Sequence, residues 1–458
     1  MRLRIIAMRK VDDYGWSGYL QANPRPSHSL TNTRASWSPR ACAYYDARTD
    51  VAWTYPKFIA WPLSDPWNEK LLPALAVNPS RLIVAAGGTI YSYKFTVSPR
   101  EHESPPVTVE GQCRLSPLSS PRRDITAITF VDDNSLDHTL YIAYQDGSLE
   151  RAAVIEPSMD RKSPFLLDRH KVDLPPGDLV RSLSSSRNCL LSLTASGHAT
   201  LSLTDPALAS SSSIELKIRS WTSHLCLHAP GPYAAFGTSS ATPLTVHAIS
   251  QDGLRAHPTA ILQPKKPTAF NAVYGIAQAP TSSPWGSSPQ ILVSGWFDGS
   301  VRCFDLRSSL RSSDADQSCA PLRPVLSLSD PLSDETVYSV SCGGGFSSHI
   351  AAGAARHSVV SFWDVRALKK SWSVHAPGND PSPVYSIKLE SSRLFGVTQS
   401  RPFVYDFVRT SGTHHPARSL TTPMQGPGVT TRTYPGLKMK NGGKPGFYVT
   451  TYAHYKIY

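Results

Sequence analysis

The chain has 458 residues, and its 46 Lys and Arg against 34 Asp and Glu give a formal net charge of +12. Hydrophobic residues make up 40% and charged residues 17%, which excludes both a membrane protein and a chain that is disordered throughout. The 39 prolines favour turns and loops over long helices.

In chain order, the first feature is a dense aromatic group in the stretch VDDYGWSGYLQANPRPS, residues 11–27. It lies in a predicted N-terminal extension that covers residues 1–35. The stretch AYYDARTDVAW follows within residues 40–53. We expect a β-strand from near Arg40 to Trp53 that closes the fold described next.

From residue 74 onward one pattern recurs: a β-run, a turn of small residues or Asp-Gly, and a second alternating run. The turns recur at intervals of roughly 40 to 60 residues, as in repeats built from four strands and variable loops. A further short run precedes most copies, and three of these runs share a Val-Tyr-Ser or Val-Tyr-Gly core. The seven copies are residues 82–95, 140–153, 190–205, 233–249, 291–306, 350–365 and 394–408.

Seven such units predict an all-β fold, a seven-bladed β-propeller with degenerate WD40-like repeats over residues 36–410. Neighbouring blades bury the sheet faces that one blade alone leaves open. We expect the strand near Arg40 to complete the sheet of residues 383–408, with a terminal strand in residues 447–458 beside it. The other residues of 411–458 form a polar, basic, Gly/Pro-rich tail.

Turn and strand-end residues in several copies resemble the WD-repeat family. They are Asp298-Gly299-Ser300 with Phe304-Asp305, Asp146-Gly147-Ser148, Trp363-Asp364 and Tyr405-Asp406. The turn Asp is expected to bond amides of its own turn, and Gly to supply a positive φ. The resemblance implies that the aromatic residue before each final Asp packs between blades. The Gly-His pair of the family is missing, so its His–Asp network should be absent or partial.

The N-terminal region also resembles the part of fungal-type F-box/WD-repeat proteins that follows the F-box. The residues concerned are Tyr14, Trp16, Tyr19 and Leu20, then Trp37-Ser38-Pro39-Arg40. The resemblance implies an SCF-type ubiquitin ligase, with a Skp-type adaptor and a cullin complex as partners. No Leu-Pro-x-Glu start or helix pair precedes Val11, so the F-box itself is not visible.

No catalytic constellation emerges, and we predict that the chain is not an enzyme and holds no cofactor or metal. Glu101-His102-Glu103 lies in a Pro-flanked loop, and Cys342 to Gly345 does not open a phosphate-binding helix. The seven cysteines include no C-x-x-C pair, which favours an intracellular location in the cytoplasm, the nucleus or both. No apolar run approaches the length of a membrane span.

The sequence therefore predicts a non-enzymatic scaffold for protein interactions, and the F-box resemblance implies the substrate receptor of a ubiquitin ligase. The alternative is a WD-repeat scaffold in a nucleic-acid or ribosome-related assembly, which the charge of +12 suits. Arg356 and Arg401, at turns of two repeats, are candidate ligands for an acidic or phosphorylated peptide. Arg181 and Arg302 lie within or beside strands of other repeats, and the sequence does not assign them to the same face. Trp285, in an insertion, is a further partner-binding candidate.

Overall fold

The computed structural model describes Arg25, Lys266, Val449 and residues 27–97, 101–115, 123–132, 138–155, 165–172, 178–205, 210–264, 270–308, 321–377, 381–408 and 451–454. Its secondary structure is almost entirely antiparallel β-strand. The helical elements in this part of the chain are η1 (His28–Leu30), α3 (Thr31–Ala35), α4 (Pro39–Thr54), the π-type turn η2 (Gly344–Ser348) and η3 (Leu368–Lys370).

Four of the sheets have the first strand of each group at one edge and pair the following strands in chain order. The first group is β2 (Ala74–Val77), β3 (Arg81–Ala86), β4 (Thr89–Phe95) and β5 (Val107–Arg114). The second is β6 (Ile125–Phe130), β7 (Thr139–Tyr144), β8 (Leu149–Ile155) and β9 (Leu166–Val172). The third is β10 (Val180–Ser186), β11 (Cys189–Thr194), β12 (His198–Leu203) and β13 (Ser211–Glu215). The fourth is β23 (Val337–Gly343), β24 (His349–Ala354), β25 (Val359–Asp364) and β26 (Trp372–His375), with β30 (Thr451–Ala453) added to β26.

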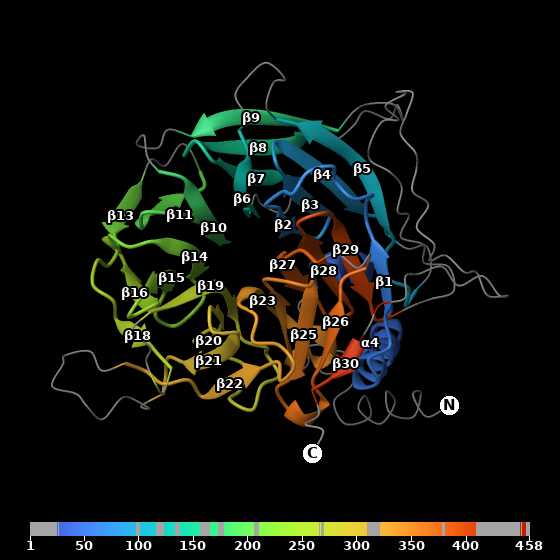
Figure 1. Cartoon of the computed structure of the whole chain (residues 1–458). Coiled ribbons are helices and arrows are strands. Elements are labelled where there is room, and N and C mark those ends of the chain that lie inside the picture. Colours follow the sequence, from blue (N-terminus) through green and yellow to red (C-terminus); the bar gives the residue numbers. More distant parts are fainter. Residues whose placement is uncertain are drawn as a thin grey trace.

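Two further sheets complete the set. A nine-stranded sheet holds β14 (Ser220–Cys226), β15 (Tyr233–Ser240), β16 (Leu244–Ser250), β17 (Gly253–Leu254), β18 (Ala260–Leu262), β19 (Asn271–Gln278), β20 (Ile291–Trp296), β21 (Ser300–Asp305) and β22 (Leu326–Ser329). The last sheet holds β27 (Val384–Leu389), β28 (Arg393–Thr398), β29 (Pro402–Asp406) and β1 (Ile59–Pro62). The groups stand in a ring, as in a β-propeller, with strands such as β6, β10 and β23 nearest the centre (Figure 1).

The predicted hairpins are confirmed, because each of the seven copies forms a pair of antiparallel strands. The turn from β20 to β21 shows the local cause. Gly299 has a φ of 76°, and the Asp298 carboxylate accepts from the amide of Ser300 at 3.1 Å. Asp146 accepts from Ser148 at 3.0 Å in the same way. Strand β14, which precedes the fourth copy, was missed because its polar residues hide the alternation.

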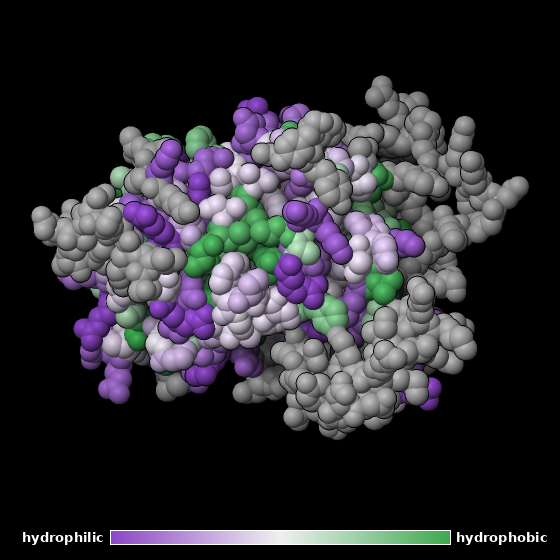
Figure 2. Space-filling model, turned by 90° about the horizontal axis from the view of Figure 1, so that it is seen from below, coloured by the Kyte–Doolittle hydropathy of each residue, from purple (hydrophilic) through white to green (hydrophobic). Residues whose placement is uncertain are grey.

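The core lies between neighbouring sheets. Phe304 of β21 is fully buried in a cluster with residues of β14, β15 and β16 from the preceding group. Trp363 of β25 is buried against Val293 and Val301 of β20 and β21. The aromatic residues at the ends of these hairpins therefore fill the spaces between sheets, as predicted. From the flank, hydrophobic side chains gather near the middle of the visible surface, with hydrophilic ones around them (Figure 2).

The strand predicted from Arg40 to Trp53 is wrong, because these residues form helix α4. Ser38 caps the helix by accepting from the amide of Ala41 at 3.3 Å, and Pro39 occupies the first turn. Buried residues recur every four positions at Ala41, Tyr45, Thr49 and Trp53, which is a helical period rather than a strand period. No helix in the described residues is long and apolar enough to cross a membrane.

The ring is closed instead by β1, which pairs antiparallel with β29 through Trp61 and Val404. A segment from before the first repeat therefore completes the sheet of the last, as predicted, but from a different place in the sequence. The terminal strand was expected beside this sheet. That placement is also wrong, because β30 pairs with β26 of the neighbouring sheet.

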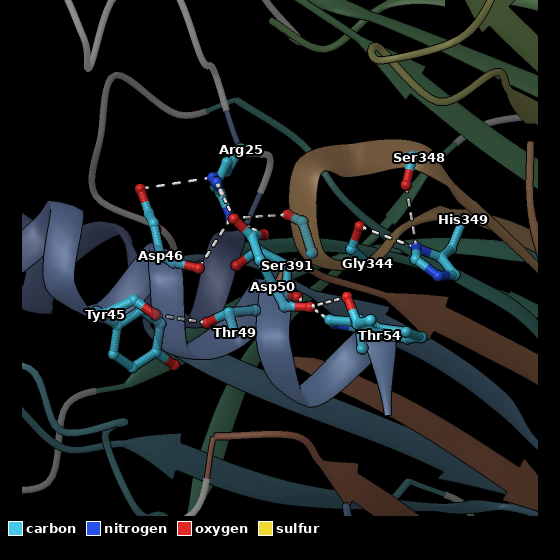
Figure 3. Close-up of polar contacts among 12 residues, drawn as sticks. Arg25, Tyr45, Asp46, Thr49, Asp50, Thr54, Gly344, Ser348, His349 and Ser391 are labelled. Atoms are coloured by element: carbon cyan, nitrogen blue, oxygen red, sulfur yellow. Dashed lines mark hydrogen bonds and ion pairs between the residues drawn. The ribbon is translucent and has the colours of Figure 1, made fainter. Parts of the chain in front are cut away.

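Arg25 and residues 27–62, which we call the N-terminal clasp, are fixed to the ring by buried polar contacts (Figure 3). Arg25 lies 2.7 Å from Asp50 and donates to the carbonyl of Gly345 at 3.2 Å. Trp53 donates to the carbonyl of Ser391 at 2.8 Å and stacks on Phe407 at 3.7 Å between ring centroids. The clasp thus joins the last two sheets. The division into residues 1–35, 36–410 and 411–458 stays a prediction, and residues 411–448 lie outside the described part.

Candidate functional site

The innermost strands share an irregularity near their first residues. In six of them the pairing register skips one residue. Such a β-bulge leaves that residue out of the ladder and changes the direction of its side chain. The skipped residues are Thr126, Arg181, Trp221, Tyr274, Tyr338 and Tyr385.

All six line one cavity of about 520 Å³, whose walls come from the strands around the centre of the ring. We call these six residues, together with Arg219, the channel mouth. Leu75 of β2 and the chain before it complete the wall. A volume of this size is in the range of pockets that hold small ligands or a few residues of a peptide.

Four aromatic rings from four successive inner strands form an arc along the mouth. The centroid distances are 4.9 Å from Trp221 to Tyr274, 5.3 Å from Tyr274 to Tyr338, and 5.8 Å from Tyr338 to Tyr385. Burial raises the pKa of Tyr274 and of Tyr385. Their hydroxyls therefore stay protonated near neutral pH and can donate hydrogen bonds.

Two guanidinium groups lie against the first ring of this arc. Arg219 is 4.3 Å and Arg181 is 5.0 Å from the ring centre of Trp221. Burial, and then the charge of Arg219, lower the pKa of Arg181, although an arginine remains protonated at neutral pH. Within the described residues neither arginine forms an ion pair with a carboxylate, and the cavity lining contains no Asp or Glu. The mouth is therefore an uncompensated positive site.

Two further basic residues lie on inner strands and are not part of the lining of this cavity. Burial lowers the pKa of His224 on β14 to about 4, with smaller contributions from His228 and Lys388. Lys388 lies on β27 and is exposed. No group of three or more His, Cys, Asp and Glu in the described residues could hold a metal ion, and the six described cysteines are free.

The predicted site residues occupy separate places. Arg356, in the turn from β24 to β25, is 74% exposed and lies 3.8 Å from Glu335. Arg401, in the turn from β28 to β29, is only 8% exposed. Arg356 and Ser400, which precedes Arg401, line a cavity of about 350 Å³ that shares no lining residue with the channel-mouth cavity. Their role in binding stays a prediction.

Three other candidates have structural partners. Trp285 is half-buried and packs on the cluster around Trp363, and its carbonyl accepts from Arg307 at 3.0 Å. Arg302 forms a double contact with Asp298 at 2.7 and 3.0 Å. Arg181, which the sequence left undecided, is the one that reaches the channel mouth.

The loop with Glu101 has a structural role. The Glu101 carboxylate accepts hydrogen bonds from the amide and the hydroxyl of Ser38, at 3.0 and 3.2 Å, at the start of α4. The shared Val-Tyr core of three inner strands was the sequence signal for the channel mouth. It marks the positions of Tyr274, Tyr338 and Tyr385. That all three side chains point into one cavity became apparent only from the β-bulges in the structure.

No protein-family model and no curated protein matches the chain. Among solved structures, it is similar to one described as the crystal structure of RRP9 WD40 repeats, with 13% identity over 76% of this chain and 97% of that chain and a TM-score of 0.49. It is also similar to the structure of U3-55K, with 12% identity, 76% and 98% coverage and a TM-score of 0.48. The class of this chain follows from its own topology: a ring of small antiparallel sheets around a shared central cavity.

Proposed function

We propose that the chain is a non-enzymatic scaffold, a seven-bladed propeller whose channel mouth binds an anionic segment of a partner. The blade number rests on dividing the nine-stranded sheet between β15 and β19, which pair only through Ser239 with Ala272 and Ser240 with Asn271. Each part then contains four main strands and the same inner bulge as the groups that begin with β6, β10, β23 and β27.

The observation that carries the binding site is the pair Arg181 and Arg219 on the ring of Trp221 without a carboxylate partner. Arg181 is half-buried and Arg219 is exposed, so the Arg181 guanidinium has lost part of its hydration without gaining an anion in exchange. A carboxylate or phosphate in the cavity would restore that interaction, because the planar guanidinium donates two parallel hydrogen bonds to such groups. The tyrosine hydroxyls along the arc offer further donors. An acidic or phosphorylated peptide fits this chemistry.

The test is binding of a fluorescent acidic peptide, measured by anisotropy, to wild type and to Arg181→Gln. Arg187→Gln is a matched control, because Arg187 is exposed in the turn at the opposite end of the same strand, β10. We expect at least tenfold weaker binding for Arg181→Gln and unchanged binding for Arg187→Gln. Equal affinity of all three proteins would remove the channel mouth as the site.

A second candidate is a scaffold in a nucleic-acid-containing assembly. It is favoured by the combination of arginines with an arc of aromatic rings, on which unpaired bases can stack, and by the net charge of +12. Binding of single-stranded RNA that weakens steeply with salt and is lost in Trp221→Ala would support it. A phosphopeptide that binds while RNA does not would favour the first candidate.

The ubiquitin-ligase prediction gains no support from the described residues or from the comparisons. Its carrying residues Tyr14, Trp16, Tyr19 and Leu20 lie outside the described part. Trp37 and Ser38, from the second part of that resemblance, belong to the clasp. Trp37 is buried with Leu30 and Tyr45, so it stabilises the ring and is not available to an adaptor.

A further inference from the structure

The C-terminal strand β30 extends a sheet that is otherwise complete. It pairs antiparallel with β26 through three residue pairs, from Thr451 with Val374 to Ala453 with Trp372. The amide of His454 then donates to the carbonyl of Ser371 at 3.0 Å. Figure 1 shows β30 beside β26, far in sequence from the strands of that sheet.

A buried carboxylate lies beneath this edge. Asp330, in the turn after β22, is 9% exposed. It accepts from the hydroxyl of Ser373 at 2.7 Å, from that of Ser361 at 3.1 Å and from the amide of Leu332 at 3.0 Å. Burial alone would raise the pKa of Asp330, but these donors and those of the tail hold it well below its usual value. Asp330 is therefore a charged acceptor at neutral pH.

The tail presents two side chains to this acceptor. The Tyr452 hydroxyl donates to Asp330 at 2.7 Å. Nε2 of His454 lies 2.7 Å from the Ser373 hydroxyl and 3.5 Å from Asp330, and its ring is 5.5 Å from that of Trp363. Residues two apart in a strand face the same side, so Tyr452 and His454 both contact the groups at this edge and define a Tyr-x-His motif. Thr451 and Ala453 point outward and are exposed.

The acceptor does not depend on the tail for its own integrity. Strands β23 to β26 pair with one another without β30, and Asp330 keeps the bonds from Ser361, Ser373 and Leu332 when the tail leaves. The edge of β26 would then present unpaired backbone groups next to the Asp330 carboxylate, which its remaining donors hold in place. Such an edge recognises extended segments by strand addition, with side-chain pockets supplying selectivity.

We propose that the outer edge of β26, with Asp330, Ser361 and Ser373, is a strand-acceptor site for the Tyr-x-His segment, and that the tail of a second copy of this chain can occupy it. The tail is joined to the ring through residues 409–448, and a segment of that length spans at most roughly 140 Å. The reach suffices for docking in the same copy or in another. Docking within one copy is favoured by its high effective concentration, and exchange grows with protein concentration.

Two complementary full-length variants test the proposal. Tyr452→Ala/His454→Ala keeps the acceptor and loses the tail anchors. Asp330→Ala keeps the tail and loses the acceptor. In neither variant can the tail bind the acceptor, whether within one copy or between two identical copies. The intact tail of Asp330→Ala, however, fits the intact acceptor of Tyr452→Ala/His454→Ala. We expect light scattering after size exclusion to show monomers for each alone and a 1:1 complex for the mixture.

Further substitutions in the tail of the Asp330→Ala protein show which tail side chains contribute to the affinity of the complex. Adding Tyr452→Phe removes one hydrogen bond to a charged group and should weaken the complex about tenfold. Adding Thr451→Val, at an exposed residue of the same strand, should leave it unchanged. If Asp330→Ala lowers the melting temperature, Asp330→Asn combined with Ser373→Ala takes its place. A mixture that stays monomeric, with both proteins folded, would overturn the proposal; the channel-mouth proposal would be unaffected, because the two sites share no residue.

Discussion

The N-terminal clasp and the channel mouth both place an arginine on an aromatic ring, but with opposite electrostatics. In the clasp, Arg25 lies 4.5 Å from the centre of the Phe346 ring and 2.7 Å from the Asp50 carboxylate. At the mouth, Arg219 lies 4.3 Å from the ring of Trp221, and no described carboxylate completes the contact. The same pair of residue types stabilises the fold where its charge is matched, and leaves a binding site where it is not.

The largest effect should come from breaking the matched charges of the clasp. Asp46 is 1% exposed and pairs with Arg34 at 2.7 Å and with Arg25 at 3.5 Å. Asp46→Ala leaves two arginines without this partner in a buried setting. We expect the free energy of unfolding in a urea titration to fall by about 3 to 5 kcal/mol. A loss below about 1 kcal/mol would show that the clasp contributes little to closure.

The clasp should also give the stability a pH dependence. Burial lowers the pKa of His349, whose ring is 4.4 Å from that of Trp53, to about 4. In the unfolded chain a histidine titrates near about 6.5. Between these values the unfolded chain binds more protons, so stability falls as the pH drops from 6.5 to 4, by roughly 2 to 3 kcal/mol.

Urea titrations at several pH values check this dependence. His349→Gln should flatten it, and His170→Gln, at an exposed histidine on β9, should not. The channel histidine His224 contributes in the same direction, but equally to all three proteins, so its effect cancels in the comparison. Parallel curves for wild type and His349→Gln would contradict the assignment.

At the channel mouth the expected effect is on binding rather than stability. Arg181→Gln/Arg219→Gln should change the free energy of unfolding by less than about 1 kcal/mol, since no ion pair is broken. It should weaken binding of an acidic or phosphorylated peptide at least tenfold. A large loss of stability with unchanged binding would show that the arginines of the channel mouth stabilise the fold, as those of the clasp do, and do not bind a partner.

The smallest effect is expected at Arg356. It is 74% exposed and 3.8 Å from Glu335, so Arg356→Glu should change stability by less than about 0.5 kcal/mol. We expect peptide affinity to change less than threefold. If capture is lost instead, the turns at Arg356 and Arg401 form the binding face, as the sequence suggested, and the mouth does not.

The hairpins could be predicted from the sequence, because a period of two residues and an Asp-Gly turn are local properties. The resemblance to WD repeats placed Phe304 and Trp363 between sheets, and both are buried there. The prediction of a strand from Arg40 to Trp53 was wrong. The four-residue spacing of the buried residues Ala41, Tyr45, Thr49 and Trp53 indicates a helix. That error was one of interpretation, since the signal was present.

The channel mouth and the strand-acceptor site arise from contacts between segments that are distant in the sequence. Arg181 and Trp221 meet because two bulges on neighbouring inner strands turn them toward one cavity. Tyr452 meets Asp330 because β30 returns to the edge strand β26, about eighty residues earlier in the chain. Both sites depend on which strands become neighbours in the closed ring, and pairing between distant segments has no signature in local sequence periodicity.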